Sequence, residues 1–310
     1  MTEIVYLNDV NYDSNSVITV GTFDGVHEGH KTIIKRVVDS ARERGARSIL
    51  VTFDPHPREI INPGKDGIKL LTTLEERAEI LDDLGITMML VIPFDRDFSL
   101  ISSEDFIHDI IYDKIGVGKF VIGYDHQFGR NREGTKATVK KLSRELGFEV
   151  EIIEAHDIGE ITVSSTNVRN ALENEGDVDL AHRFLGRPYH IKGTVVHGDK
   201  RGKEIGFPTA NVKPENHKKI IPKNGVYAVD IKVGETIYKG VMNIGIRPTF
   251  NGSDERTIEV NIFDFSSNIY GETVEIWFIK RIRDELRFKS VEELIEQIKN
   301  DKVIAQRLNK

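Results

Sequence analysis

A short glycine-rich segment near the N-terminus places two histidines where they could act on a phosphate group. Residues 21–30 read GTFDGVHEGH, so His27 and His30 are three residues apart and Gly25 and Gly29 lie beside them. On a helical turn both rings can project to one side. The glycines let the backbone come close to a ligand, and free N–H groups at a helix start suit a phosphate. Neutral imidazoles donate hydrogen bonds to phosphoryl oxygens, and protonated imidazoles also stabilise developing negative charge.

Two other interpretations of this histidine pair must be weighed. Histidines at this spacing could bind a metal ion, but no nearby cysteine and no obvious carboxylate partner completes a metal site. They could also be ordinary surface histidines that follow a turn. A strand-like segment before the glycines and a helical pattern after them favour the phosphate site over both.

The second half of the chain carries a basic glycine-rich segment and a strand-like segment with a central carboxylate. Residues 198–211 read GDKRGKEIGFPTAN, which by itself is typical of a solvated basic loop. In residues 257–265 apolar side chains alternate from Ile258 onward, so Glu259 points away from the apolar face. From this pattern alone, Glu259 is expected to be a solvent-exposed residue of a strand.

The elements before residue 186 alternate between strands and helices. A helical pattern over His30–Arg44 ends at Gly45, and Thr73 with Glu76 predicts a capped helix that ends before Gly85. Further helices are expected after Ser103 and Thr135. This alternation favours a doubly wound parallel sheet, with ligands at the carboxyl ends of the strands. The expected strands are Val17–Phe23, Ser48–Phe53, Met88–Ile92, Phe120–Gly123 and Val150–Ile153.

From residue 186 onward the helical spacers disappear. Strand-like segments separated by Gly, Asn and Pro turns favour an antiparallel barrel or sandwich. A last helix is expected to start at Ser290, whose partner Glu293 completes a capping box. We therefore expect two domains, residues 1–185 and 186–310. The expected strands of the second are Ile191–His197, Val226–Val233, Thr236–Asn243, Thr257–Phe265 and Thr273–Lys280.

Composition narrows the possible functions. The 310 residues are about two domains' worth of chain. With 43 Lys+Arg against 50 Asp+Glu the net charge is −7, which argues against general nucleic-acid binding. The absence of cysteine excludes disulfides, thiolate zinc sites and a cysteine nucleophile. The longest apolar stretch, around Ile86–Phe94, is too short for a membrane helix, and the N-terminus lacks the plan of a signal peptide. We expect a cytoplasmic monomer that binds small molecules, with no nucleic-acid or membrane partner.

The segment GTFDGVHEGH resembles the HxGH motif of nucleotidyltransferases and, more narrowly, the opening of the bacterial bifunctional riboflavin kinase/FMN adenylyltransferase family, also called FAD synthetases. Residues 53–57 (FDPHP) and 123–129 (GYDHQFG) also match this family, although His126 and Gln127 depart from its pattern. Residues 164–169 (SSTNVR) resemble its second phosphate motif, although Ser164 could simply cap a helix. The resemblance implies a Rossmann-like nucleotidyltransferase domain.

This resemblance implies that the first domain transfers AMP from ATP to FMN, giving FAD and pyrophosphate. His27, His30 and Arg169 would then stabilise charge on the triphosphate. The remaining residues that we expect to bind ATP or FMN are Gly21, Phe23, Asp24, Gly25, Gly29, Asp125, Ser164, Ser165 and Thr166.

Residues 206–211 (GFPTAN) resemble the riboflavin kinase signature, which implies a C-terminal antiparallel β-barrel that makes FMN from riboflavin and ATP. Thr209 and Asn211 are expected on one strand and therefore on the same side of it. The resemblance assigns both to Mg²⁺, a cation that prefers oxygen ligands. It also makes Glu259 the general base for the flavin hydroxyl. Asn261 stands where relatives often carry histidine and receives no catalytic role. We further expect Gly206, Pro208 and Arg247 in substrate binding.

Two alternative functions remain open at this point. One is an adenylyltransferase with a single activity, whose barrel only binds flavin. The other is a non-catalytic flavin sensor, since a fold does not fix a function. A nucleotidyltransferase for another acceptor would leave the second half of the chain unexplained.

Overall fold

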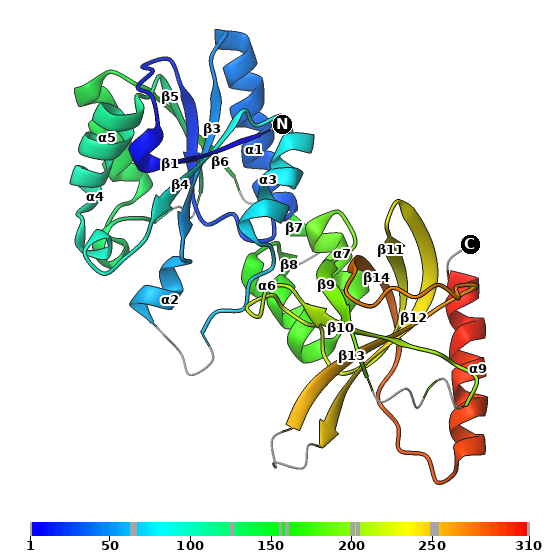
Figure 1. Ribbon diagram of the computed structural model, residues 1–310. Coiled ribbons are helices and arrows are strands. Elements are labelled where there is room, and N and C mark those ends of the chain that lie inside the picture. The colour runs from blue at the N-terminus through cyan, green and yellow to red at the C-terminus, as the bar shows by residue number, and fades with distance from the viewer. Residues whose placement is uncertain are drawn as a thin grey trace. The chain divides into compact units, whose positions relative to one another are not determined.

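The computed structural model describes residues 2–62, 67–124, 127–154, 157–158, 161–198, 202, 205–248 and 254–308. The chain divides into two compact units, Met1–Ser165 and Thr166–Lys310 (Figure 1). Among the described residues, no helix is both long enough and apolar enough to cross a membrane.

The first unit is built on a six-stranded parallel sheet, which confirms the predicted fold class. The strand order is β1-β4-β3-β2-β5-β6. Strands β3 and β4 are added on one side of β2, and β5 and β6 on the other, so the strand order reverses between β2 and β5. Such a switch point is where open parallel sheets bind ligands. The short edge strand β1 was not predicted. The strands are β1 Glu3–Tyr6, β2 Val17–Val20, β3 Ser48–Asp54, β4 Met88–Pro93, β5 Lys119–Gly123 and β6 Glu149–Ile153.

Helices cover both faces of this sheet, and successive residues of its strands enter two separate cores (Figure 1). Leu50 packs with helices α1 and α3, whereas Ile49 and Val51 pack with η3 and α5. This alternation is the period of two that a strand imposes. The helical elements are α1 Glu28–Arg44, α2 Pro57–Ile61, α3 Leu74–Asp83, α4 Ser103–Asp105, the π-helix η3 Phe106–Ile115 and α5 Lys136–Leu146, with short 3-10 turns η1 Leu7–Asp9, η2 Phe98–Leu100 and η4 Arg130–Arg132, and a small hairpin of β7 Asp157–Ile158 and β8 Ile161–Thr162.

Both predicted helix signals in the first half are present. Helix α1 begins two residues before the predicted His30 and ends at Gly45, which has the left-handed φ of 59° expected of a C-cap. At the start of α3, the Thr73 hydroxyl accepts the N–H of Glu76 and the Glu76 carboxylate accepts the N–H of Thr73. The capping box is therefore complete.

We expect Thr73→Ala to lower the free energy of unfolding by about 1 kcal/mol, because the N–H of Glu76 would lose its acceptor. Urea unfolding followed by circular dichroism measures this loss. Thr73→Ser keeps the hydroxyl and serves as the control. Equal stability of the alanine and serine variants would contradict the assignment.

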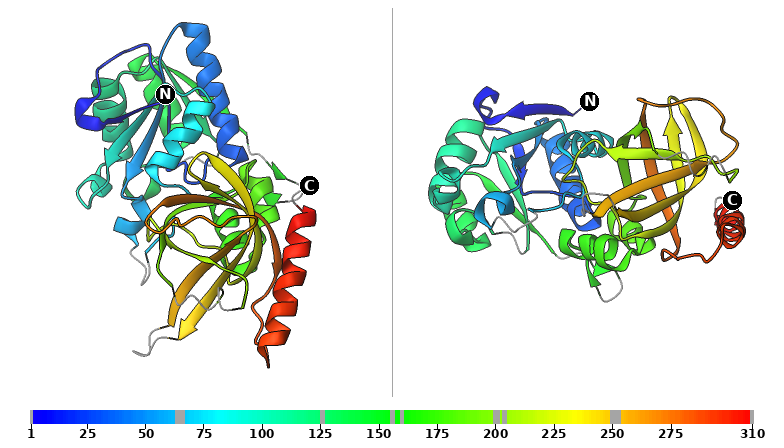
Figure 2. Two further views of the ribbon diagram at one scale, coloured as in Figure 1. Left: turned by 45° about the vertical axis from the view of Figure 1, so that its right-hand side comes forward. Right: turned by 60° about the horizontal axis from the view of Figure 1, so that its bottom comes forward.

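The second unit is a closed antiparallel barrel, so the barrel alternative is confirmed over the sandwich (Figure 2). Around the barrel the order is β10-β13-β12-β11-β14-β9. Of the two residues expected on one strand, Asn211 lies in β10 and Thr209 directly precedes it; no bounds were predicted for this strand. The elements of this unit are α6 Ser165–Asn170, which begins at the last residue of the first unit, η5 Ala171–Glu175, α7 Val178–Leu185, β9 His190–Val196, β10 Ala210–Pro214, β11 Gly225–Val233, β12 Thr236–Pro248, β13 Asp254–Ile262, β14 Thr273–Arg283 and α9 Val291–Leu308.

The C-terminal helix α9 is fixed to the barrel by apolar packing and by one buried carboxylate. Ala305 packs against Ala228 and Phe263. Asp301, which is 2% exposed, accepts two parallel hydrogen bonds from Arg283 at 3.0 and 2.7 Å. At the start of the helix, the Ser290 hydroxyl accepts the N–H of Glu293 at 3.3 Å, which is one half of the predicted capping box. The Glu293 carboxylate accepts the N–H of Lys289 at 2.9 Å in place of that of Ser290.

Candidate active sites

The loop that follows β2 has an uncommon backbone conformation. Phe23 and Val26 have positive φ angles of 46° and 41°, and Gly25 between them has a φ of 85°. Non-glycine residues in this region cost about 1–3 kcal/mol each, and they persist only where the surroundings hold them. Phe23 is 3% exposed and Val26 is fully buried, so core packing supplies that hold. The loop lies at the carboxyl end of β2, beside the switch point of the sheet.

Asp24 anchors this loop to the segment before α3. Its carboxylate is fully buried and accepts hydrogen bonds from the N–H groups of Leu71 at 3.0 Å and Thr72 at 2.9 Å. The Thr72 hydroxyl in turn accepts the N–H of Gly25 at 3.0 Å. These contacts direct the Asp24 carboxylate into the protein interior, which gives this residue a positioning role within the loop.

The two histidines of the motif stack on each other at the start of α1. Their ring centroids are 3.6 Å apart with an angle of 17° between planes. His27 is the N-cap of the helix, and its Nδ1 accepts the N–H of His30 at 3.3 Å. A Cβ at Gly29 would lie 3.3 Å from the His27 ring, so a side chain at this position would press on the stacked histidines.

His30 is held as a neutral imidazole. Burial, followed by electrostatic interaction with His27 and then with Arg77, lowers the pKa of His30 well below its usual 6.5. Its Nδ1 is buried and has no hydrogen-bond partner among the described residues. The side chain therefore has unused hydrogen-bonding capacity at the carboxyl end of the sheet.

The structure brings the start of the second predicted phosphate motif to the first. The Ser165 hydroxyl donates to the carbonyl oxygen of Asp24 at 2.8 Å, across a sequence separation of 141 residues. Ser164 is half-buried and Thr166 is exposed at the start of α6. Arg169 lies on α6 in the second unit and is half-buried. Asp125, a further predicted ligand-binding residue, lies outside the described residues.

A cluster of aromatic rings lies beyond the carboxyl ends of β3 and β4, and sequence reasoning did not single it out. Phe53 ends its apolar run in β3 with a ring centroid 5.6 Å from that of Phe94, which follows β4. Neighbouring rings elsewhere in the cluster are 5.4–6.5 Å apart, within the range of favourable aromatic pairs. The only signal in the sequence was an aromatic residue at the end of each strand. The members are Phe53, Phe94, Phe98, Phe106 and Phe128.

In the second unit, Glu259 lies between two asparagines on neighbouring strands. Its register partners are Asn211 on β10 and Asn243 on β12, and directly opposed residues share one face of a sheet. The Thr209 hydroxyl donates to the Glu259 carboxylate at 3.4 Å. The buried residues Ile258 and Val260 alternate with Glu259, as predicted. Three predicted site residues are therefore brought together, and Asn243 is an addition.

Glycines let the side chains of this site lie directly against the protein backbone. A Cβ at Gly198 would overlap the side-chain amide of Asn211, so that amide lies directly against the Gly198 backbone. A Cβ at Gly202 would lie 3.3 Å from the Thr209 hydroxyl. Gly206 is exposed and has a left-handed φ of 85°.

Asn261 has a structural role that sequence reasoning missed. Its side-chain amide donates to the carbonyl oxygen of Pro208 at 2.7 Å, which ties the exposed Pro208 and the turn it belongs to onto β13. The remaining predicted residue, Arg247, lies on β12, and its side chain is outside the part of the unit that the structure describes.

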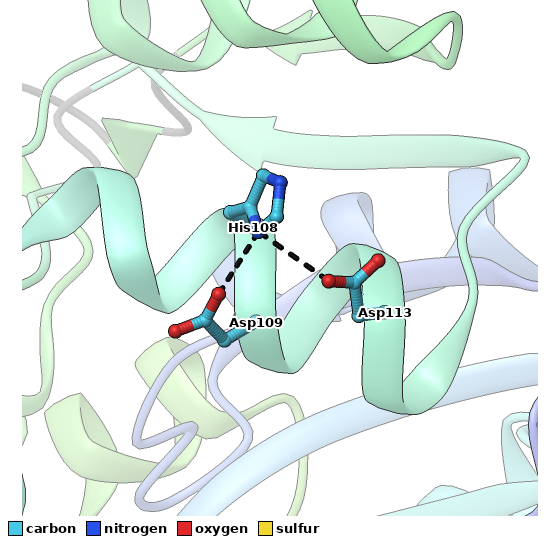
Figure 3. A group of neighbouring side chains, drawn as sticks. All are labelled: His108, Asp109 and Asp113. Carbon is cyan, nitrogen blue, oxygen red and sulfur yellow. Dashed lines mark hydrogen bonds and ion pairs between the residues drawn. The ribbon is translucent and has the colours of Figure 1, made fainter.

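One group of imidazole and carboxylate side chains elsewhere in the first unit has the spacing of metal ligands (Figure 3). On η3, Nδ1 of His108 lies 2.9 Å from Asp109 and 3.4 Å from Asp113. All three side chains are exposed, and exposed ion pairs of this kind form without a ligand. We therefore assign this group no metal.

The His108 group supports a pH prediction. The hydrogen bond that His108 donates to the Asp109 carboxylate, and then the charge of Asp113, raise the pKa of His108 above its usual 6.5. A raised folded-state pKa stabilises the fold below the unfolded pKa, and this contribution is lost as pH rises through the folded pKa. We expect Asp109→Asn to lower the pKa of His108 more than Asp113→Asn does, as measured by NMR titration. An equal or reversed order would contradict the geometry.

Comparison with known proteins gives each half of the chain a family. The FAD synthetase family model matches residues 9–167, and the riboflavin kinase family model matches residues 185–309. Curated proteins named bifunctional riboflavin kinase/FMN adenylyltransferase, from Listeria monocytogenes and Bacillus subtilis, are each 40% identical to the chain over 93% of its length and 91% of theirs. A crystal structure described as a macrolide-efflux protein from Streptococcus pneumoniae is 31% identical, with a TM-score of 0.90 and 98% of both chains covered.

Proposed function

The chain belongs to the bifunctional riboflavin kinase/FMN adenylyltransferase family, and from this premise we propose that its two units divide the two activities between them. The chain phosphorylates riboflavin with ATP to give FMN, and it transfers AMP from a second ATP to FMN to give FAD and pyrophosphate. The observation that supports the division is that each unit gathers its own set of polar side chains, around His30 in one and Glu259 in the other.

In the first unit, an oxygen of the FMN phosphate attacks the α-phosphorus of ATP while the bond to the β-phosphate breaks. Pyrophosphate leaves, and no bond to the protein forms. His27 and His30 lie at the N-terminus of α1, where the helix dipole suits the negative charge that develops on the triphosphate. Because the pKa of His30 is low, His30 acts as a neutral hydrogen-bond donor.

The remaining ATP contacts in the first site follow from where these residues lie. Gly21, Gly25 and Gly29 offer backbone to the triphosphate, and the Phe23 ring lies against His30 with a centroid distance of 4.8 Å. We assign Asp24 to shaping this loop through Leu71 and Thr72. The residues that we propose for the β- and γ-phosphates are Ser164, Ser165, Thr166 and Arg169, and Asp125 remains proposed for a flavin or adenine contact.

In the second unit, Glu259 accepts the proton of the terminal ribityl hydroxyl as that oxygen attacks the γ-phosphorus of ATP. The bond from the γ-phosphorus to the β-phosphate oxygen breaks, and ADP leaves. The hydroxyl of Thr209 lies 3.4 Å from this carboxylate, and the amide of Asn211 is on the neighbouring strand. Hydroxyl, amide and carboxylate oxygens form a donor set that suits Mg²⁺, so we propose that Thr209 and Asn211 hold it. When bound, Mg²⁺ would neutralise charge on the phosphates. Gly206, Pro208 and Arg247 are proposed to border the substrate.

Gly198→Ala tests the proposed arrangement of the second site. The new Cβ would overlap the amide of Asn211 and displace it, while the backbone of Gly198 has no positive φ that alanine would strain. A displacement of this size costs roughly a hundredfold in rate, so we expect riboflavin phosphorylation to fall by that factor. FAD formation from FMN should be unchanged on the same chain. Wild-type rates of FMN formation would contradict the role of Asn211.

The two half-reactions can be measured separately to test the proposed function. With riboflavin and ATP the protein should form FMN and ADP, and with FMN and ATP it should form FAD and pyrophosphate. EDTA should stop both reactions, and added Mg²⁺ should restore them. FAD formation without riboflavin phosphorylation would reduce the barrel to a flavin-binding module. Flavin binding without either reaction would make the chain a sensor.

We propose that the chain acts in the cytoplasm as a monomer. Its proposed substrates are ATP, riboflavin and FMN, and the proposal includes no nucleic-acid or membrane partner.

A further inference from the structure

One buried charged residue of the first unit has no part in the steps above. Arg77 lies on α3 and is only 4% exposed. Its Nη1 donates to the hydroxyl of Thr52 on β3 at 2.9 Å, and its Nη2 donates to the carbonyl oxygen of Thr72 at 3.4 Å. The same Nη2 lies 3.8 Å from the carboxylate of Asp24. Arg77 thereby connects β3, the segment before α3 and the histidine loop.

Burial of the Asp24–Arg77 ion pair among apolar side chains costs free energy of folding. Its helix neighbours Ala78 and Leu81 are buried in the apolar core between α1 and α3. Removing a guanidinium and a carboxylate from water costs several kcal/mol per ion, and a well-packed apolar pair is often at least as stable. Stability of α3 alone therefore gives little reason for an Asp24–Arg77 pair at this point. A role in the neighbouring site is a better explanation.

Arg77 is also one of the charges that face His30. From its own helix His30 faces His27, and from α3 it faces Arg77. Asp24, on the loop, lies against Arg77 and offsets part of its charge. On the α1 surface, Glu28 and Lys31 pair with each other at 2.7 Å. Among the described residues, the Arg77 guanidinium adds to burial and His27 in disfavouring the protonation of His30.

We propose that Arg77 is a positioning residue for adenylyl transfer, which holds the loop of residues 21–30 in shape through its contacts with Thr52, Thr72 and Asp24. This inference rests on the proposed transfer reaction at this loop. Arg77 touches neither ATP nor FMN in this account. It acts through the shape of the loop, and its charge contributes to the lowered pKa of His30.

Two substitutions separate these two effects. Arg77→Lys keeps a positive charge but loses the forked pair of hydrogen bonds to Thr52 and Thr72. Arg77→Met removes both the charge and the hydrogen bonds, and it leaves the Asp24 carboxylate without this cation. We expect each variant to form FAD from FMN roughly a hundredfold more slowly, because small displacements at a reacting centre have effects of this size. Riboflavin phosphorylation, measured on the same samples, should stay at the wild-type rate.

The pH profile gives a readout that a purely structural role would not move. If neutral His30 is the active form, FAD formation is lost as pH falls through the pKa of His30. Arg77→Met should raise this pKa, so the acid limb should move to higher pH. Arg77→Lys should slow the reaction and leave the acid limb in place.

NMR titration of labelled histidines tests the charge effect without any activity. The His30 signal, assigned by its loss in His30→Gln, should titrate at higher pH in Arg77→Met than in the wild type. This result stands even if the protein made no FAD, so failure of the proposed function and failure of the inference are distinguishable. If Arg77→Met does not fold, Thr52→Val removes one hydrogen bond of Arg77 and should slow FAD formation without moving the acid limb. Wild-type FAD formation in Arg77→Lys and Thr52→Val would overturn the proposal, as would an unmoved His30 titration in folded Arg77→Met.

Discussion

The His30→Ala variant should form FAD from FMN at least a hundredfold more slowly than the wild type and should still phosphorylate riboflavin at the wild-type rate. Removing one preorganised hydrogen-bond donor to a developing charge typically costs about 10²–10³ in rate. His30 is the residue whose ring stacks on His27 at 3.6 Å and whose Nδ1 has no partner among the described residues. The substitution therefore removes a hydrogen-bonding group that is available to a substrate.

His108→Ala is the matched control for His30→Ala. His108 lies in the same unit, but its side chain is exposed and contacts only carboxylates of η3 in the described part of the chain. We expect this variant to keep both activities. Equal loss of both activities in His30→Ala would contradict the division of labour between the units, because His30 lies in the first unit alone. Chromatographic separation of riboflavin, FMN and FAD measures both reactions in one sample.

Glu259→Gln should have the opposite selectivity. General-base catalysis contributes about 10²–10⁴ to a rate, so riboflavin phosphorylation should fall by a factor in that range. Glutamine is close to glutamate in size and can still accept a hydrogen bond from Thr209, which lies 3.4 Å from the carboxylate. It cannot take up a proton. The fall in riboflavin phosphorylation therefore measures the loss of proton transfer to residue 259. FAD formation from supplied FMN should be unaffected.

The control for Glu259 is Glu272→Gln, at an exposed turn before β14. This variant removes the same charge from the same unit and should keep both activities. If Glu259→Gln phosphorylated riboflavin at the wild-type rate, Glu259 would not be the base, and the resemblance that assigned it would fail at this position. A parallel fall of FAD formation from FMN would instead indicate damage that is not confined to the second unit.

The sequence predicted most of the fold because apolar runs, glycines and caps act locally. Five of the six strands of the sheet, β2 to β6, and the helix from Glu28 were visible as patterns. The edge strand Glu3–Tyr6 was missed because three of its four residues are exposed and show no apolar alternation. Strand β10 is five residues long and ends at Pro214, which is a weak strand signal. The π-helix over Phe106–Ile115 could not be told from an α-helix by apolar spacing.

The histidine site was predicted less completely, because half of it depends on tertiary packing. His27 and His30 stand out by spacing, and Ser165 stands out by resemblance. The partners of Asp24 do not, because Leu71 and Thr72 lie 47 and 48 residues further along the chain in an unremarked segment. Arg77 was indistinguishable from any charged residue of an amphipathic helix. Only the folded arrangement shows that its guanidinium is buried beside the histidine loop.

The barrel site depends on strand register, which the sequence does not give. Glu259 was placed on the correct face by the alternation of apolar residues. That its neighbours are Asn211 and Asn243 follows only from the pairing of β13 with β10 and β12. Asn261 had no assigned role until its amide was found to donate to Pro208.

The central claim is that one chain carries out both reactions in succession. The most direct test is a time course of the wild-type protein with riboflavin, ATP and Mg²⁺, in which the three flavins are separated chromatographically. We expect FMN to appear first and then to decline as FAD accumulates. Riboflavin that remains unconverted, while supplied FMN still gives FAD, would contradict the claim.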